Sequence, residues 1–345
     1  MFEPKISILV PTLNSAKTLG ACLKAIRDQD YPEDKVEIIV ADAGSTDSSA
    51  ALAHRFGAIV TDNPLKTGEA GKTAAAKRAT GDILALIDSD NILPDRDWLH
   101  RMVAPFEDAS IAASEPLAYT ARPEDPPLVR YFARLGMNDP LCLFLGTYDR
   151  TCAVTGKWTE LPVETEDRGD YLALTLRRGE VFPTIGANGF LVRRELLPRT
   201  KYDPYWFDVD ILHDLANTAP DGIVRVAKVK TGIVHLYCDK LEDFERKQNR
   251  RVRDFLYFSR QRGGDSPRGS KGRLMRGIFA FGLATVLGFP LRSQARRGQL
   301  VAPDSEAWAF HGPVCRATLR IYARATIRKL LGFRQAPASR TTWKQ

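Results

Sequence analysis

The sequence predicts an α/β protein in which a mostly parallel sheet is flanked by helices and followed by a basic helical C-terminal tail. Three observations support this fold class: short apolar runs alternate with helical patterns, polar clusters follow the runs, and the charge changes sign near residue 245. Strands that alternate with helices imply right-handed crossovers and parallel pairing. We therefore expect one large α/β core and a separate tail.

The predicted strands are short runs of Ile, Val and Leu, as in a sheet that helices cover on both faces. The runs extend from Ile6 to Val10, from Val36 to Val40 and from Ile83 to Ile87, with a weaker run from Ala58 to Val60. Parallel strands place their carboxyl ends at one edge of the sheet, and that edge is where open α/β sheets bind ligands.

Helical patterns fill the gaps between the runs. The first helix is marked by apolar residues at i, i+3, i+4 and i+7, which are Leu19, Cys22, Leu23 and Ile26. Further helices are expected over about 48–55 and 68–79. Asn14 or Ser15 is expected to cap the first helix, because Asn and Ser are favoured N-cap residues.

Polar residues follow each strand. Asp88 and Asp90 come directly after the run that ends at Ile87, whereas Pro11–Asn14 follows the first run and Asp42–Asp47 the second. Two neighbouring carboxylates repel each other unless a cation lies between them, and hard divalent ions prefer oxygen ligands. The pattern favours a metal beside an anionic ligand, although paired Asp residues also occur as turns and helix caps.

These segments resemble the inverting family 2 glycosyltransferases of the GT-A fold, the nucleotide-diphospho-sugar transferase fold, in their membrane-associated form. The matching segments are residues 8–14, 37–47 and 81–90, and the resemblance is firm over about 5–105. It implies that the base and ribose of a nucleotide-sugar donor are held by Pro11, Thr12, Asn14, Asp42, Ser45 and Asp47.

The same resemblance makes Asp88, Ser89 and Asp90 the DxD element, which meets the ribose and a Mg²⁺ or Mn²⁺ ion on the diphosphate. A diphosphate leaving group develops negative charge, and a metal ion neutralises it. His235 ends the run Thr231–His235 and is a candidate third metal ligand, as a late histidine is in some GT-A enzymes. The alternative is a structural histidine at a strand end.

Lys72 is a further candidate for donor binding. Gly68–Thr73 ends like a phosphate-binding loop, but the glycine that this loop requires five positions before Gly71 is Lys66. The sequence therefore contains no P-loop, and no Gly-x-Gly-x-x-Gly motif indicates a nicotinamide cofactor. Lys72 can still reach a phosphate, and the alternative is a solvated charge on a helix face.

The resemblance places acceptor recognition in residues 106–245. Gly186, Asn188 and Gly189 lie in the segment expected under the acceptor, although an ordinary tight turn explains the glycines equally well. An attacking hydroxyl must lose its proton, so a carboxylate near it helps. Asp210 is our first choice for this base and Asp208 the second, although Asp208 can instead cap a helix. Glu166–Asp167 is the fallback.

The charge asymmetry points to an anionic partner for the tail. Residues 1–245 carry a net charge of −10, whereas residues 246–345 carry +18. Residues 277–291 are uncharged but too short to span a bilayer, so they are expected to be interfacial or re-entrant. Arginines recur every fourth residue on one helix face, opposed by apolar side chains that include Leu319, Ile321 and Leu330, as on a helix lying on an anionic leaflet. The arginines are Arg316, Arg320, Arg324 and Arg328.

Alternatives remain for this tail. A buried helical hairpin with solvated arginines has the same pattern. Arg251 lies in a basic segment that can grip a diphosphate or an acceptor phosphate with its guanidinium. Gln248 and Arg251 have the Gln-x-x-Arg spacing that processive family members follow with Trp, but Val252 stands there. Nucleic acid is the weakest choice of partner, because the basic segment lacks interleaved exposed aromatic residues.

The sequence therefore predicts a nucleotide-sugar-binding half (1–105), an acceptor-binding half (106–245) and a basic helical membrane-associating region (246–345). The expected activity is metal-dependent transfer of a sugar to a lipid-linked or glycan acceptor, on the cytoplasmic face of a membrane, in cell-surface polysaccharide or glycolipid synthesis. Five cysteines without paired spacing and no secretory signal at Met1–Pro4 agree with this compartment.

Three other functions remain open. A polyprenyl-phosphate acceptor is already ionised and requires no protein base. A nucleotidyltransferase shares the sheet and the acidic pair, but it usually carries a glycine- and arginine-rich loop after its first strand, where this chain has Pro11–Ser15. A non-catalytic nucleotide-binding protein at the membrane surface would need Asp42 but tolerate loss of Asp90.

Overall fold

The structure, a computed structural model, describes residues 2–261 and 271–331. Its internal contacts divide the chain into two compact units: Met1–Thr120 with Pro162–Leu236, and Ala121–Leu161 with Tyr237–Gln345. These divisions differ from the three consecutive ranges expected from the sequence, because residues 121–161 group with the C-terminal helices. The sequence of residues 261–272 is rich in Gly and Ser and predicts a flexible linker, but most of this segment lies outside the described residues.

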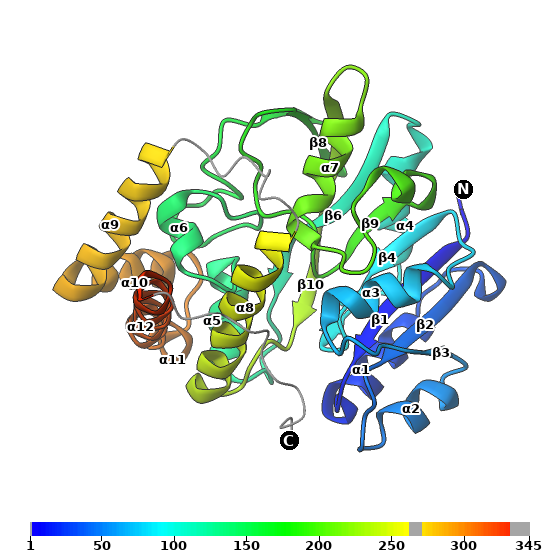
Figure 1. The fold of residues 1–345 in the computed structure, drawn as a ribbon, viewed down its shortest axis with the longest axis horizontal. Coiled ribbons are helices and arrows are strands. Elements are labelled where there is room, and N and C mark those ends of the chain that lie inside the picture. Colours follow the sequence, from blue (N-terminus) through cyan, green and yellow to red (C-terminus); the bar gives the residue numbers. More distant parts are fainter. Residues whose placement is uncertain (1, 262–270, 332–345) are drawn as a thin grey trace. The chain divides into compact units, whose positions relative to one another are not determined.

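The first unit is built on a single mixed sheet (Figure 1). Its strands are β1 (Ile6–Thr12), β2 (Val36–Asp42), β3 (Ile59–Asp62), β4 (Ile83–Leu86), β5 (Asn91–Ile92), β6 (Ile111–Thr120), β7 (Glu164–Asp167), β8 (Tyr171–Arg177), β9 (Phe190–Arg193) and β10 (Ile223–His235). Within the described residues the strand order is β3-β2-β1-β4-β9-β6-β10-β8-β7, and β5 pairs with β10. The four predicted strands are confirmed as β1, β2, β3 and β4.

Strand direction follows the expectation of a mostly parallel sheet. β1 pairs in parallel with β2 and β4, β2 pairs in parallel with β3, and β6 pairs in parallel with β10. β9 and β8 run antiparallel to their neighbours. The first four strands therefore end at one edge, which is the edge that the polar clusters follow.

Helices cover the sheet of the first unit. They are α1 (Ala16–Arg27), α2 (Ser49–Arg55), α3 (Gly68–Ala76), α4 (Trp98–Val103) and α7 (Ile211–Thr218), with short 3₁₀ turns at Glu33–Lys35, Ala104–Glu107, Arg194–Arg199 and Asp208–Asp210. The predicted apolar face of α1 is buried in one core with alternate residues of β1, β2 and β4. β1 and β4 are buried along their whole length, so both of their faces are covered.

The second unit is helical. It contains α5 (Pro127–Leu135), α6 (Leu141–Leu145), α8 (Leu241–Gln261), α9 (Lys271–Leu287), α10 (Phe289–Val301), α11 (Ser305–Trp308) and α12 (His311–Leu330). Two apolar clusters hold these helices together, one around Phe132 and Phe244 and one around Phe281 and Leu291.

The predicted basic helix is α12, and its arginine side chains at 316, 320, 324 and 328 are exposed as expected. Its apolar side is used differently from the expectation. Ile321 is buried and Leu319 packs against the second cluster, while Arg320 forms an ion pair with Glu245 of α8. Much of the apolar face of α12 therefore belongs to the protein core, which matches the alternative of a packed helix with solvated arginines.

No helix in the described ranges is by itself both long and apolar enough to cross a bilayer. The pair Gly272–Leu287 and Phe289–Val301 meets the length and composition criteria when the two helices are taken together, and they meet at an angle of 93°.

Candidate active site

The carboxyl ends of β1, β2 and β4 lie side by side. Thr12 of β1 is in register with Asp42 of β2, and Leu9 of β1 is in register with Leu86 of β4. Asp88 and Asp90 follow β4 by two and four residues. Three of the polar clusters expected to meet therefore do so at one edge of the sheet. Pro11 and Thr12 are buried there at the end of β1.

Asp42 organises the loop after β2. One carboxylate oxygen accepts hydrogen bonds from the backbone amides of Gly44 (3.0 Å) and Ser45 (2.9 Å), and the other accepts one from the Ser45 hydroxyl (2.5 Å). The Ser45 hydroxyl oxygen accepts the backbone amide of Asn14, whose side-chain oxygen accepts the amide of Thr46. The two loops predicted to hold a nucleotide thus support each other.

Asp47 ties the loop after β2 to the start of two helices. Its Oδ2 accepts the backbone amide of Ala16, the first residue of α1, and its Oδ1 accepts the amide of Ser49, the first residue of α2. Ser15 occupies the N-cap position of α1, one of the two positions expected, but its side chain forms no capping hydrogen bond, and Asp47 supplies the side-chain acceptor instead. A donor-binding role for Asp47 stays a prediction.

The loop after β4 is held by a chain of amide side chains. Asn91 accepts the backbone amide of Asp88 and donates to the side-chain oxygen of Asn188, which in turn donates to the Tyr119 hydroxyl. Ser89 donates to the hydroxyl of Ser15 at 3.0 Å. The structure thus joins the predicted DxD element to Asn188, and it adds Asn91 and Tyr119, which the sequence reasoning missed.

Asp90 lies beside His235. Its Oδ1 is 3.5 Å from His235 Nε2, and its backbone oxygen accepts the amide of Leu236. The imidazole lies against the Tyr119 ring, with 5.7 Å between ring centroids. No set of three or more His, Cys, Asp or Glu side chains in the described part of the chain is arranged to hold a metal ion. Asp90 and His235 are therefore neighbours, and their role as metal ligands stays a prediction.

Lys72 is buried on α3, so the alternative of a solvated charge is wrong. Its ammonium lies 2.8 Å from Asp208 Oδ2 and 3.3 Å from Asp88 Oδ1. Burial alone would lower the pKa of Lys72, but the two carboxylates raise it above its ordinary value. Gly71 explains the close approach of α3, because a Cβ there would lie 2.7 Å from Cβ of Pro11.

Asp208 is the acid that Lys72 brings to this cluster. Burial raises the pKa of the Asp208 carboxyl to about 7, although the neighbouring Lys72 acts to lower it. Its second oxygen, Oδ1, is buried, and no described residue donates a hydrogen bond to it. Asp210, our first choice for a base, lies at the N-terminus of α7, where its charge acts on His213. Asp208 is thus the acid in contact with Lys72, and the choice between Asp208 and Asp210 as the base stays a prediction.

The predicted acceptor loop packs closely against the backbone of Asp208. Gly186 and Gly189 have positive φ values of 142° and 91°, as glycine permits. A Cβ on Gly186 would lie 2.1 Å from the backbone oxygen of Asp208, so only glycine fits beside it. The amide of Gly186 donates to Glu115, which forms a fully buried ion pair with Lys228 at 2.6 Å.

Sequence reasoning missed the Glu115–Lys228 pair. A single charge within an apolar strand is usually exposed, and these two partners are 113 residues apart. Another pair of candidates lies away from the cluster within the first unit. Glu166 and Asp167 are exposed on β7, five strand positions from β4, or roughly 24 Å at the usual strand spacing. Arg251 lies on α8 in the second unit, and its phosphate-binding role stays a prediction.

The sheet order and the polar groups at its carboxyl edge define the first unit as a GT-A fold, the fold of nucleotide-sugar transferases. A mannosyltransferase from Pyrobaculum calidifontis, solved in complex with GDP-Man and Mn²⁺, superimposes with a TM-score of 0.55 at 18% identity. The match covers 97% of this chain and 89% of that one. At this identity the likeness shows the fold alone.

The chain belongs to glycosyl transferase family 2, because the model of that family matches residues 7–197, more than half of its length. Glycosyltransferase AglE of Haloferax volcanii is 29% identical over 114 residues, which are 31% of this chain and 37% of that protein. The O-antigen chain rhamnosyltransferase RfbN of Salmonella typhimurium is 32% identical over 113 residues, which are 32% and 35% of the two chains. The match thus spans little more than a third of either relative.

Proposed function

We propose that the protein is an inverting, metal-dependent glycosyltransferase that moves a sugar from a UDP- or GDP-type donor to a hydroxyl of a lipid-linked or glycan acceptor. The observation that carries this proposal is the contact of the Lys72 ammonium with both Asp88 and Asp208. Asp88 belongs to the segment expected to meet the donor, and Asp208 to the segment expected to supply the base. One buried cation thus joins the groups required for leaving-group departure and for nucleophile activation.

Asp208 is assigned the role of general base. Direct displacement at the anomeric carbon requires the attacking hydroxyl to lose its proton, and a base works best when its pKa lies near the working pH. The raised pKa of Asp208, about 7, meets this condition. Its Oδ1, to which no described residue donates, is the atom assigned to accept the proton.

A divalent metal fits the residues at Asp90. Mg²⁺ and Mn²⁺ sites in phosphate-transfer enzymes commonly use one or two carboxylates, with substrate phosphates completing the shell. The neighbouring Asp90 and His235, together with Asp88 on the same loop, would form the protein side of such a site. When bound, the ion would neutralise charge on the diphosphate leaving group. Lys72, which its two carboxylate neighbours keep protonated, would add a second positive charge.

The loops after β1 and β2 are assigned to the nucleotide. Asp42, Ser45 and Asn14 are fixed by hydrogen bonds to one another before any ligand arrives, so little ordering is needed on binding. A hydroxyl acceptor is favoured over a polyprenyl phosphate, because a buried acid with a raised pKa beside the donor segment serves no purpose for a nucleophile that is already ionised. The basic region 246–345 supports peripheral association with an anionic membrane at its cytoplasmic face.

Thermal shift of the purified protein tests the donor site. UDP-, GDP- and dTDP-sugars are added with and without Mn²⁺, to the wild type and to Asp90→Ala. Stabilisation by one donor that requires the metal and is lost in the variant is the expected result, since a ligand that binds the folded state raises its stability. Absence of stabilisation by every donor in the wild type would contradict the proposal.

A further inference from the structure

The outer face of α9 presents a row of large apolar side chains to solvent. Phe279 is 71% exposed and Val286 77% exposed. Of the sixteen exposed large apolar residues in the described ranges, nine lie between Met275 and Val301, and they are Met275, Ile278, Phe279, Leu283, Val286, Leu287, Phe289, Leu300 and Val301. Monomeric soluble proteins seldom expose such a concentrated apolar surface, so something is expected to cover it.

The opposite face of α9 is already used. Gly277 lies against Leu145 so closely that a Cβ would be 2.6 Å from its Cδ2, and the Phe281 ring contacts that of Phe144 edge-on. The exposed residues at 275, 279, 283 and 286 therefore form a second apolar stripe, on a helix that is apolar nearly all round. A helix with this composition is normally buried on every side, in a core or in lipid.

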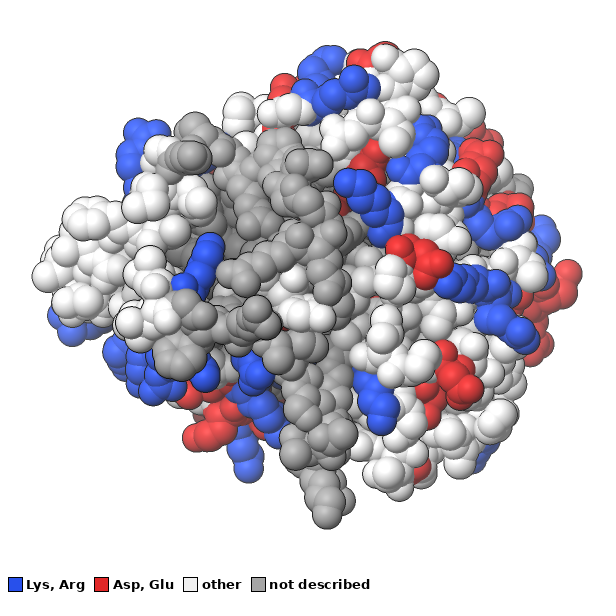
Figure 2. Space-filling view, in the orientation of Figure 1, with Lys and Arg blue, Asp and Glu red and all other residues white. Residues whose placement is uncertain are grey.

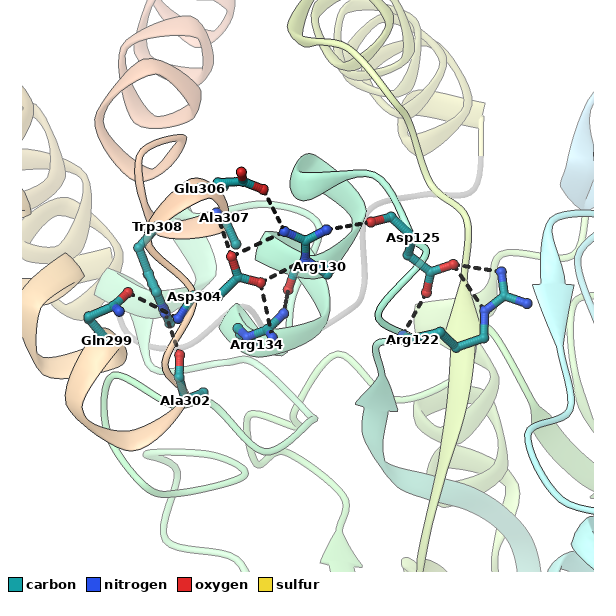
Figure 3. A network of polar contacts seen from close by, with 10 residues as sticks. All are labelled: Arg122, Asp125, Arg130, Arg134, Gln299, Ala302, Asp304, Glu306, Ala307 and Trp308. Atoms are coloured by element: carbon teal, nitrogen blue, oxygen red, sulfur yellow. Dashed lines mark hydrogen bonds and ion pairs between the residues drawn. The ribbon is translucent and has the colours of Figure 1, made fainter.

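Ion pairs connect the turn that follows α10 to α5. Asp304 pairs with Arg130 (2.7 Å) and Arg134 (3.0 Å) and caps α11 through Ala307, while Arg130 also reaches Glu306 (Figure 3). The Trp308 indole donates to the Ala302 carbonyl in the same view. Packing at Gly277 and Phe281 and ion pairs after α10 thus hold the α9–α10 pair within the second unit, while the residues of its outer stripe are exposed in the described part of the chain.

The charges around this apolar surface indicate what kind of partner it binds. Residues 271–303 contain six basic residues and no acidic one, and Arg273, Arg276, Arg292, Arg296 and Arg297 are among them. In Figure 2 the surface over α9 is almost free of charge, with Lys and Arg side chains along its border. A symmetric dimer through this face would bring the same arginines opposite one another and repel. An anionic lipid surface attracts them instead.

We propose that the α9–α10 pair is a monotopic insertion element, whose outer stripe enters one leaflet of an anionic phospholipid bilayer while its arginines bind the headgroups. Neither helix is by itself long and apolar enough to span a bilayer, and the two meet at an angle of 93°, so we assign the bent pair to a single leaflet. Insertion of about 5–10 Å, as for other interfacial helices, suffices to cover the stripe. The inference rests on the membrane association in the proposed function and narrows it to the α9–α10 pair, which contains the segment 277–291, rather than α12.

Vesicle flotation of the full chain tests the assignment, with vesicles of phosphatidylcholine alone or with added phosphatidylglycerol. The double variant Phe279→Glu/Val286→Glu is expected to lose binding by about tenfold or more, since two exposed apolar side chains that would enter the lipid become charged. The matched control is Ile327→Glu/Leu330→Glu, which alters two exposed apolar residues of α12 and is expected to bind as the wild type does. Arg292→Gln/Arg296→Gln/Arg297→Gln is expected to weaken binding to anionic vesicles about fivefold per charge at low salt.

Two results would overturn the insertion element. One is equal binding by the wild type and the Phe279→Glu/Val286→Glu variant. The other is a wild type that does not bind vesicles and sediments as a dimer, together with a Phe279→Glu/Val286→Glu variant that sediments as a monomer. The donor-dependent thermal shift separates this inference from the proposed activity. If the wild type floats with vesicles but no donor stabilises it, the proposed transferase activity is contradicted and the insertion element is still supported.

Discussion

The two units differ in how they place apolar side chains. Both units bury charges: Lys72 and Lys228 are enclosed in the first unit and Arg150 in the second. The second unit also exposes a row of apolar side chains on one helix, among them Phe279 and Val286. Each departure from ordinary burial destabilises the isolated folded chain, so each needs a compensating purpose. The difference teaches that exposed apolar surface, rather than buried charge, is what sets the second unit apart.

The largest effect that would sharpen this comparison is expected at Asp208. Asp208→Asn removes the proposed base and should lower kcat for transfer to a hydroxyl acceptor by about 10² to 10⁴ fold, the usual contribution of general base catalysis. Asp210→Asn is the matched control, two residues away, and should stay within about threefold. Rates of sugar transfer from the donor that the thermal shift selects provide the measurement. A larger loss in Asp210→Asn would assign the base to Asp210.

The next effect concerns the pair that supports the Gly186 loop. Glu115→Gln keeps an acceptor for the Gly186 amide but leaves Lys228 buried without its counter-charge, so the free energy of unfolding should fall by about 3–5 kcal/mol. Glu115→Gln/Lys228→Met removes both charges and should recover most of that loss. Urea denaturation measures both variants. If the double variant is no more stable than the single one, loss of the attraction between Glu115 and Lys228 does not explain the fall in the free energy of unfolding.

The third effect concerns the influence of the Lys72 charge on the pH dependence of activity. A cation beside a carboxyl favours its ionised form, so Lys72→Met should raise the pKa of Asp208 above its value of about 7. Because the base must be ionised, the acidic limb of the profile of kcat/KM against pH should move upward by about one unit or more. Lys77→Met, which removes an exposed lysine paired with Asp203, is the control and should leave the limb in place. An unshifted limb in Lys72→Met would separate Lys72 from the base.

The smallest effect is expected in the second unit. Phe279→Ser changes an exposed side chain that the folded protein does not use, so the free energy of unfolding in solution should change by no more than about 0.5 kcal/mol. Phe281→Ser, two residues along α9, removes a buried ring and should destabilise by about 3 kcal/mol or more. Thermal or urea unfolding without vesicles compares them. Equal losses would show that the outer face of α9 is packed against protein.

Much of the first unit could be predicted because its signals are local. The strands β1, β2 and β4 are continuous apolar runs, and Asp42 and Asp88 come where those runs end. The burial of Lys72 had no local signal, because its partner Asp208 is 136 residues away. The side-chain acceptor at the start of α1 had no local signal either, because Asp47, which supplies it, is 31 residues from Ala16, whereas the N-cap position at Ser15 agrees with the local pattern.

The tail shows a different limit of sequence reasoning. The periodicity of α12 correctly predicted an amphipathic helix with exposed arginines, but periodicity does not say what an apolar face contacts. Ile321 faces the protein core, whereas Phe279, on a helix with a weaker pattern, faces outward. Which of two apolar surfaces remains uncovered depends on how many helices compete for one core, and only the tertiary structure decides that.

Gly71 has a consequence for genetics. A single methyl group at this position would meet Pro11 at 2.7 Å and push α3 away from β1, together with the lysine that follows it. Most of the fold would survive such a small displacement at low temperature, but the weakened packing would fail on warming. Gly71→Ala is therefore the change we would choose to obtain a temperature-sensitive variant, one that is folded when cool and loses its fold when warm.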